Sequence, residues 1–377
     1  MRKFSSIFIL FAASFVLLAI FSFSQVDLNL TLSTNSLYQL FQTQLTSLGY
    51  FHRLLSIKIF ILILFLLHAS YFILHRLVNK NKLTKRNIWF LIGLATLLLI
   101  PSYPAFSHDI FNYIFDARIV TKYGLSPWSF SALDFPADDW IRFMRWTHRP
   151  TVYPPIWIGL STIPSFLGLG KFIVTLGWFK IISAAAYLGS ASLIYKLAKL
   201  LKHKKPLRTL VLFAFNPLVI IEGLVNAHME MVMIYFGLLS LYLLLKKRKT
   251  ISWASFLASV GIKYMTVYLG LVLIKGKKYL RQSIWLGMLA TAIWILWYGF
   301  QPWYILWVFP FALLVEKTWE RQFLINSSVA ALFWYIPLVL LGDFDLPDPN
   351  VRLTKYVLVP LLIFILLRGL KYKQIST

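Results

Sequence analysis

The stretch from Ser107 to Arg118 carries the densest set of side chains that could do chemistry. As a helix, it would present four polar side chains on one side at i, i+3, i+4 and i+7 spacing: Asp109, Asn112, Tyr113 and Asp116. A carboxylate at the start of a helix just above a bilayer can take a proton from a hydroxyl group that arrives from water. Asp109 is therefore the candidate general base, with Ser107 as the candidate N-cap. The alternative is that Asp109 only stabilises the positive end of the helix dipole.

A second group lies in the sequence His148-Arg149-Pro150-Thr151-Val152-Tyr153-Pro154-Pro155. The guanidinium fork of arginine matches the oxygens of a phosphate group, so His148 and Arg149 are candidate phosphate ligands. Ordinary anchoring at the membrane interface is the alternative for this aromatic-rich stretch.

Ionisable residues also occur in two later apolar segments. Glu222 lies near the edge of one, where such a residue is a functional candidate. His228 and Glu230 follow it and could bind a metal, although two ligands without a third are a weak pattern. Lys263 lies in the middle of another apolar segment, where an ammonium group needs a carboxylate, carbonyl groups or a lipid phosphate as partner. Snorkelling of Lys263 to the cytoplasmic surface is the alternative.

The composition of the chain identifies a multi-pass membrane protein. The 377 residues are 59% hydrophobic, and only 14% are charged. Several apolar runs approach the roughly 20 residues that cross a bilayer core of about 30 Å. The absence of cysteine excludes disulfides, thiol catalysis and cysteine-based metal sites. The net charge of +25 comes largely from short basic loops, at 76–86, 196–208, 246–249 and 275–281, which indicates cytoplasmic loops rather than nucleic-acid binding.

The charge pattern predicts ten spans with both termini in the cytoplasm. We expect them at about 4–23, 55–74, 87–105, 172–195, 207–225, 229–245, 281–299, 303–316, 322–341 and 353–370. The first is expected to be a retained span rather than a cleaved signal peptide. Two apolar segments do not fit as simple spans. Residues 153–170 contain three prolines and are expected to be broken, re-entrant or surface-lying, and residues 251–274 are expected to form a helical hairpin that dips from the cytoplasmic face.

The predicted fold is thus an all-α multi-pass membrane protein that forms one transmembrane domain over residues 1–377. The large loop after the third span, with the candidate base, lies on the non-cytoplasmic side of the cell membrane. Most of the carboxylates fall on that side as well.

Five motifs in the same order resemble the C-type (GT-C) membrane glycosyltransferases that use polyprenyl-phosphate sugars, especially the mannosyltransferase branch. The motifs are the acidic stretch His108–Arg118 with the turn Gly124–Trp128, the sequence Tyr153-Pro154-Pro155, the stretch Asn216–Glu230, Lys263-Tyr264, and the stretch Gln301–Pro310. The resemblance covers residues 87–316. Trp128 stands where many relatives have Tyr, and Glu230 where Asp is commoner, which blurs the identity of the donor and the acceptor.

The resemblance implies a GT-C-like bundle with extra N-terminal spans at 1–86, a catalytic module at 87–316 and C-terminal spans at 317–377. It also implies inverting transfer of a hexose, most simply mannose, from a polyprenyl-phosphate sugar to a lipid or glycan acceptor. Asp109 would be the base, and Asp116 with Arg118 would position Asp109 or the acceptor. The leaving phosphate would meet Arg118, Arg149, His148 or Lys263. The other candidate substrate-binding residues are His108, Tyr113, Tyr153, Glu222, His228 and Glu230. No cofactor is expected, and a role for a divalent cation is left open.

A polytopic transporter or lipid flippase is the alternative class. Transporters bury charges near the bilayer midplane and often contain internal repeats. This chain has few charges within spans beyond Lys263, and no convincing repeat. An O-antigen polymerase or ligase would also use lipid-linked sugars and a large outer loop, but the order of the motifs favours the glycosyltransferase.

Overall fold

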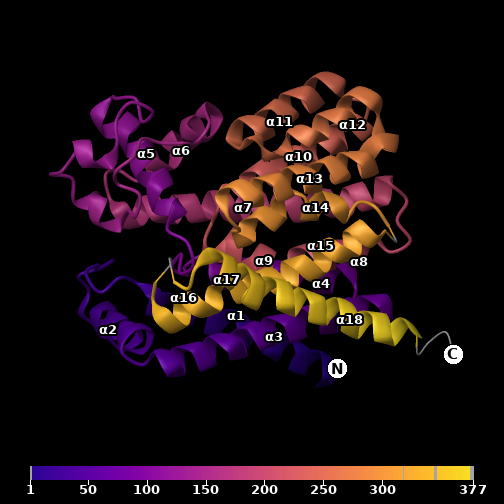
Figure 1. Cartoon of the computed structure of the whole chain (residues 1–377), viewed down its shortest axis with the longest axis horizontal. Helices are drawn as coiled ribbons and strands as arrows, with labels where there is room; N and C mark the ends of the chain where they lie inside the picture. The colour runs from indigo at the N-terminus through magenta and orange to yellow at the C-terminus, as the bar shows by residue number, and fades with distance from the viewer. Residues whose placement is uncertain (1, 317, 344–345, 374–377) are drawn as a thin grey trace.

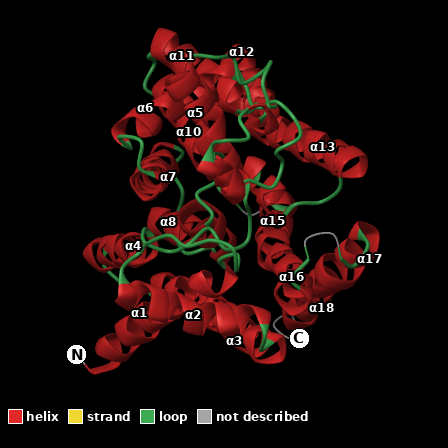
Figure 2. Ribbon diagram, turned by 90° about the vertical axis from the view of Figure 1, so that its left-hand side faces the viewer, coloured by secondary structure: helices red, strands yellow, loops and turns green. Residues whose placement is uncertain are grey.

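A computed structural model describes residues 2–316, 318–343 and 346–373 of the chain. In this part of the chain the regular structure is entirely helical, as predicted (Figures 1 and 2). The longer helices are α1 (Arg2–Ser22), α2 (Ser36–Tyr50), α3 (Arg53–Asn79), α4 (Lys85–Leu99), α5 (Asp109–Tyr123), α6 (Pro155–Leu167), α7 (Phe172–Leu200), α10 (Glu230–Leu245), α11 (Lys249–Ile262), α13 (Leu280–Tyr298), α15 (Trp319–Ala330) and α18 (Val359–Lys373). The short ones are α8 (Pro206–Ala214), α9 (Pro217–Ile220), α12 (Gly270–Lys275), α14 (Phe309–Ala312), α16 (Tyr335–Leu341) and α17 (Pro349–Leu353).

Six stretches of the described chain are long and apolar enough to cross a membrane, or seven if one bent pair counts as a span. They are Phe8–Gln25, Arg53–Asn79, Phe172–Leu200, Lys277–Tyr298, Trp319–Leu341 and Pro349–Leu366, and the bent pair is Pro206–Ala214 with Pro217–Val225. All seven coincide with predicted spans. Several apolar helices of this kind fit a multi-pass membrane protein.

None of the remaining three predicted spans forms a helix in the described chain that is long enough to cross a bilayer core. Helices α4 and α10 have 15 and 16 residues, which at 1.5 Å per residue is less than the thickness of a bilayer core. The span predicted over 303–316 does not form one continuous α-helix. A 3-10 segment, Pro302–Trp307, is followed there by the short α14, because Pro310 has no amide hydrogen with which to continue a helix from the preceding turn. The total of ten spans stays a prediction.

The segment expected as a helical hairpin folds back on itself. Helix α11 ends at Ile262, Lys263 is extended (φ −156°), and a 3-10 segment, Tyr264–Leu269, returns into α12. The hydroxyls of Ser259 and Thr266 lie 2.7 Å apart across the two arms. Lys263 is therefore the tip of this hairpin. The proline-rich segment forms α6, a 13-residue helix with Pro164 inside it.

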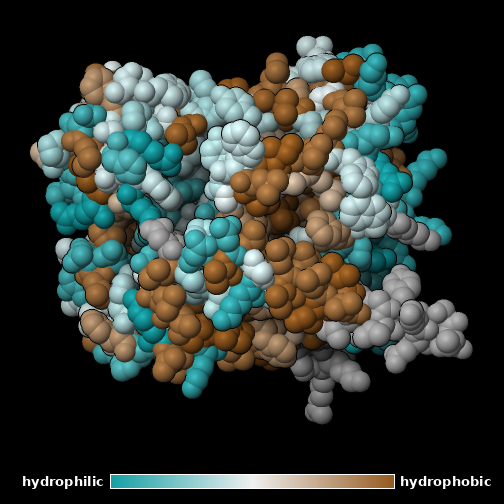
Figure 3. Space-filling model, viewed as in Figure 1, coloured by the Kyte–Doolittle hydropathy of each residue, from teal (hydrophilic) through white to brown (hydrophobic). Residues whose placement is uncertain are grey.

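The candidate chemical groups gather at one end of the molecule. Figure 1 places α2, α5, α6 and α16 at the left end, and both chain termini toward the other. Figure 2 looks onto this left end, where α1–α3, α15–α18 and α5–α12 surround a central region of loops. Figure 3 shows apolar side chains over the middle of the visible face, with hydrophilic ones at both ends. Leu296 and Leu366 are examples of exposed apolar residues, at 83% and 66% exposure, as lipid-facing residues would be.

Candidate active site

A cavity of about 610 Å³ lies where α5 begins, within the range of roughly 300–1,000 Å³ typical of ligand pockets. Its wall comes from the start of α5, the loop before Pro154, the tip of the α11 hairpin and the segments after α13. Charged and polar residues of the wall include His108, Asp109, Arg145, Arg149 and Lys263. Aromatic residues of the wall include Tyr153, Trp294, Tyr298, Trp303, Tyr304, Trp307, Trp334 and Tyr335.

Asp109 occupies the first turn of α5, and its side chain is 13% exposed, toward the cavity. His108, not the expected Ser107, occupies the N-cap position, and its side chain makes no capping hydrogen bond. The Ser107 hydroxyl accepts a hydrogen bond from the Asp109 amide at 3.3 Å. Burial raises the pKa of Asp109 above its ordinary value, although the nearby charges of His228 and Lys263 oppose this effect. A carboxylate of raised pKa that faces a cavity is suited to accept a proton.

Three carboxylates surround His228, which is 1% exposed. Its Nδ1 lies 3.6 Å from Asp109 Oδ2 and 3.6 Å from Glu230 Oε2, and its Nε2 lies 3.4 Å from Glu222 Oε2. These separations are longer than ordinary hydrogen bonds. The imidazole also stacks on Trp303, with ring centroids 4.4 Å apart.

Lys263 completes this group from the tip of the hairpin. Its ammonium makes an ion pair with Glu230 Oε1, which also accepts a 3.3 Å hydrogen bond from the Trp307 indole. The lysine does not snorkel away, because its side chain is only 17% exposed and lines the cavity. We name these five residues, Asp109, Glu222, His228, Glu230 and Lys263, the acid cluster.

Glu222 approaches the His228 ring from the side opposite to Asp109 and Glu230. It lies in a π-helical turn, Ile221–Val225, and is fully buried. Its carboxylate accepts hydrogen bonds from Asn226 at 2.8 Å and from the Tyr335 hydroxyl at 2.7 Å. Glu222, His228 and Glu230 do not line the cavity but support Asp109 and Lys263, which do.

The other polar residues on the predicted face of α5 are buried beside the cavity rather than in its wall. Tyr113 packs edge-on against Tyr153 and Trp157, at 4.9 and 5.1 Å between ring centroids. Asp116 is 5% exposed, and burial raises its pKa to about 7 against the opposing effects of Thr151 and Arg149.

Arg118 does not reach the cavity. Its guanidinium pairs with Asp138 at 2.7 Å and lies over the Trp140 ring. Asp138 also accepts hydrogen bonds from Lys122 at 2.9 Å and Tyr123 at 2.6 Å. We name these five residues the loop cluster. Burial alone would raise the pKa of Asp138, but the hydrogen bonds from Arg118, Tyr123 and Lys122 hold it well below its ordinary range.

The loop before Pro154 supplies arginines to the cavity. Arg149, which the sequence predicts, and Arg145, which it does not, both line the wall, whereas His148 is exposed outside it. Burial and the Arg145 charge lower the pKa of His108 to about 4. At neutral pH this imidazole is uncharged, so the arginines are better phosphate ligands than His108.

Further cavity residues come from parts of the chain that carry no predicted site residue. Tyr335 and Arg352 belong to the C-terminal segment, and Trp303 and Trp307 belong to the Gln301–Pro310 motif. This motif was the feature of the sequence from which the two tryptophans could have been predicted as site residues. Nothing in the local sequence marks Arg352, which is 2% exposed and donates a hydrogen bond to the carbonyl of Trp334.

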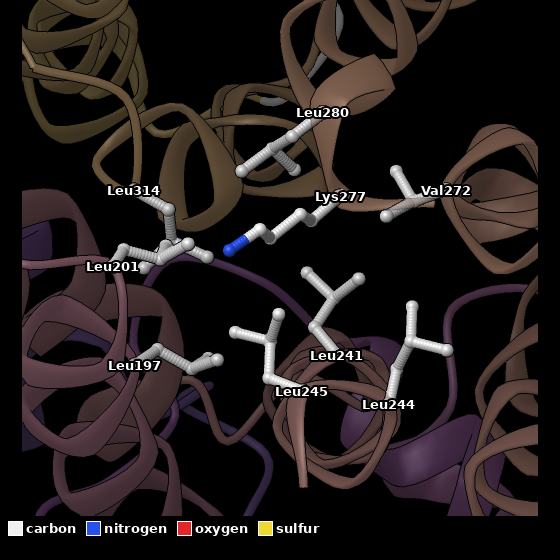
Figure 4. A pocket seen from close by; sticks show the side chains of 9 residues that line it. All are labelled: Leu197, Leu201, Leu241, Leu244, Leu245, Val272, Lys277, Leu280 and Leu314. Atoms are coloured by element: carbon white, nitrogen blue, oxygen red, sulfur yellow. The ribbon is translucent and has the colours of Figure 1, made fainter. Parts of the chain in front are cut away.

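No group of three or more His, Asp or Glu side chains within the described residues has the geometry to hold a metal ion. A second, much smaller cavity of about 10 Å³ lies beside the C-terminal ends of α7 and α10. Leucines form most of its wall, and the Lys277 side chain points into it (Figure 4). It has room for about one water molecule and offers no reactive group besides that ammonium.

Comparison with known proteins supports the prediction that the chain is a glycosyltransferase. Residues 10–276 match the family described as alpha-(1->6)-mannopyranosyltransferase, N-terminal domain. No curated protein and no solved structure gives a significant match. Since the matched residues make up well over half of the chain, it belongs to this mannosyltransferase family, which confirms the expected glycosyltransferase and not the transporter.

Proposed function

We propose that this mannosyltransferase moves a mannosyl residue from a polyprenyl-phosphate donor to a hydroxyl group of a glycan or lipid-linked glycan, on the non-cytoplasmic face of the cell membrane. The observation that supports this most directly is the carboxylate of Asp109, which faces a 610 Å³ cavity also lined by Arg145, Arg149 and Lys263. A base and cations in one cavity are the two requirements of a sugar transfer that expels a phosphate.

Asp109 acts as the general base. Its raised pKa brings it closer to neutrality, where a base accepts protons most effectively in catalysis. His228 and Glu230 lie on its buried side and leave its other side open to the cavity. The acceptor hydroxyl therefore approaches Asp109 from the cavity.

The arginines of the loop stabilise the leaving phosphate. Arg149 is exposed and lines the cavity, so its guanidinium can turn toward a phosphate. Lys263 is held by Glu230, which offsets part of its charge toward an anion in the cavity. Asp116 lies close enough to influence Arg149 electrostatically and thus serves as a positioning residue.

The reaction is a single displacement with inversion. The acceptor oxygen forms a bond to the anomeric carbon, the bond from that carbon to the phosphate oxygen breaks, and Asp109 takes the hydroxyl proton. Because the family name specifies an α-(1→6) linkage, the acceptor hydroxyl is the 6-hydroxyl of a hexose. Inversion to an α product also requires a donor of β configuration.

The donor is expected to enter from the lipid. Tyr264 and Tyr298 line the cavity and are 60% and 65% exposed. Such amphipathic rings suit a position where a lipid chain leaves the membrane and its head group enters a polar site. The prenyl tail would remain in the bilayer between these residues. The short basic loops on the opposite side keep this end of the molecule non-cytoplasmic.

The test uses the full chain in lipid nanodiscs with radiolabelled β-configured polyprenyl-phosphate mannose and a mannoside that carries a free 6-hydroxyl. Wild type should transfer mannose, whereas Asp109→Asn should lose about 1,000-fold in rate. Asp139→Asn, at a carboxylate that is 85% exposed in the same loop region, is the matched control and should keep the wild-type rate.

Two outcomes would overturn parts of this proposal. Absence of transfer by wild type from any polyprenyl-phosphate sugar would exclude this donor class. Near wild-type transfer by Asp109→Asn would exclude Asp109 as the base. We expect no cofactor, and a chelator added to the same assay tests whether a divalent cation assists.

A further inference from the structure

Lys180 is a buried lysine whose charge is held by oxygen dipoles. It lies on α7 and is 3% exposed. Its ammonium donates hydrogen bonds to the Ser102 hydroxyl at 3.0 Å and to the carbonyl oxygens of Leu224 and Val225, at 2.5 and 2.7 Å. Three donors thus meet three acceptors, which satisfies the whole ammonium group.

Two of these acceptors end the turn that carries Glu222. Leu224 and Val225 are the last residues of the π-helical turn, whose carbonyls point toward the negative end of its dipole. From the same face of α7, the Ser183 hydroxyl donates a 2.7 Å hydrogen bond to the carbonyl of Gly223. Helix α7 therefore binds three consecutive carbonyls of this turn.

The backbone after this turn needs such support. Ala227 has a left-handed conformation, with φ of 52°, which is unfavourable for a residue with a Cβ. His228 follows it directly, and its amide donates a 3.0 Å hydrogen bond to the carbonyl of Glu222. The position of the imidazole against Asp109 therefore depends on how this widened turn is held.

The third acceptor belongs to the loop that leads to Asp109. Ser102 lies between α4 and α5, and in the same loop the Phe106 amide donates a 3.1 Å hydrogen bond to the Asn226 side chain. Asn226 in turn donates to Glu222. Lys180 thus lies where the two backbone segments that bring Asp109 and His228 together approach each other.

We propose that Lys180 is a positioning residue that fixes the 221–228 turn to the loop before α5 and so holds His228 against Asp109. This role rests on the proposed function of Asp109. A lysine fits it because a compact ammonium directs three donors at separate acceptors. A neutral side chain of similar length leaves three buried oxygens without a donor, so the turn shifts.

The principal test replaces Lys180 with methionine in the nanodisc transfer assay described above. Since a displacement of about 1 Å at a catalytic group can cost about 100-fold in rate, Lys180→Met should lower kcat by about 100-fold per folded molecule. The KM for the donor should be unchanged, because Lys180 does not line the cavity. Lys196→Met is the matched control, on an exposed lysine of the same helix, and should retain wild-type kcat.

A double-mutant cycle distinguishes positioning from a general loss of stability. If Lys180 acts through His228, then His228→Gln should cost little further rate once Lys180→Met is present. Multiplicative losses would show that the two residues act independently and would overturn the proposal. So would an unchanged kcat in Lys180→Met, or an equal loss in kcat and rise in donor KM.

If the melting curve of Lys180→Met shows that it does not fold, two variants that each remove a single hydrogen bond test the proposal instead. Ser102→Ala removes one acceptor of the ammonium, and Ser183→Ala removes the neighbouring bond to the turn. Each should lower kcat by about tenfold, the value of one hydrogen bond of about 1.4 kcal/mol, and neither should change the donor KM. Wild-type kcat in both would overturn the proposal, whereas an inactive wild type would instead count against the proposed function.

Discussion

The acid cluster and the loop cluster combine the same kinds of side chain but differ in how completely these are satisfied. In the loop cluster, Asp138 accepts hydrogen bonds from Arg118, Lys122, Tyr123 and the Trp140 amide, all at 3.0 Å or less. In the acid cluster, His228 lies 3.4 Å or more from each of its three carboxylates.

This difference separates a structural role from a chemical one. The Asp138 carboxylate has four close donors, so it has little capacity left to bind a proton or a substrate. Its lowered pKa also makes it a poor base. Asp109 has its pKa raised and faces a cavity. Buried polar groups that lack full hydrogen bonding are unusual in proteins, and a catalytic role is one reason for them.

The largest expected effect on stability tests the acid cluster. Glu230→Gln leaves the Lys263 ammonium beside a neutral amide, so we expect a loss of about 4 kcal/mol in the free energy of unfolding and of about 100-fold in transfer rate. Thermal melting and the transfer assay measure the two effects. Glu316→Gln, at an exposed carboxylate, is the control and should change neither.

The same pair can be removed completely. Glu230→Gln combined with Lys263→Met removes both charges of the ion pair and should recover most of the stability without recovering transfer. Recovery of both would show that the ion pair only maintains the fold.

The second effect is a pH dependence that arises at Asp116. Its pKa rises from 3.8 to about 7 in the folded protein, so the folded state binds this proton more tightly than the unfolded chain does. The stabilisation is therefore present at low pH and is lost as the pH rises toward 7. Between pH 5 and pH 7 the loss should be about 2 kcal/mol, as measured by denaturation at each pH.

Asp116→Asn should remove this part of the pH dependence, because an amide does not titrate in this range. Asp139→Asn should keep it. An unchanged pH dependence in Asp116→Asn would mean that the carboxylate is ionised and well solvated at pH 7.

The sequence predicted the apolar helices better than it predicted the contacts of the site. Long apolar runs such as 55–74 and 172–195 form helices because burial in lipid or protein requires internal hydrogen bonding. Lys263 was recognised because a charge in an apolar stretch needs a partner, but only the hairpin shows that the partner is Glu230. Its position at a tip explains why an ammonium occurs in the middle of the stretch.

The spacing of Asp116 and Arg118 in the sequence already argues against a shared role in the site. Two residues apart on a helix, Asp116 and Arg118 point to different sides, so both cannot face one substrate. Conversely, Tyr335 bonds Glu222 across more than a hundred residues of chain, and Arg352 reaches the cavity from the C-terminal segment. Such long-range contacts leave no local periodicity or spacing in a single sequence.

The third effect tests the loop cluster. Asp138→Asn weakens the hydrogen bonds from Arg118 and Lys122 and should cost about 1.5 kcal/mol of stability. The rate of transfer per folded molecule should stay within about threefold of wild type, a change of less than 1 kcal/mol. Limited proteolysis of the 124–154 loop and the transfer assay are the measurements. A loss of rate as large as that of Asp109→Asn would show that the loop cluster takes part in the reaction and does not only stabilise the loop.

The smallest effect concerns Lys122, the most exposed member of the loop cluster. Its side chain is 46% exposed, against 12% for Arg118, although both pair with Asp138 at similar distances. Water screens an exposed ion pair and the lysine loses rotamer entropy on pairing, so Lys122→Met should cost about 0.5 kcal/mol or less. Arg118→Met should cost several times more, because it also loses the stacking on Trp140. Wild-type melting temperatures in both variants would mean that Asp138 is held by Tyr123 and the Trp140 amide, and that neither cation is needed for the loop.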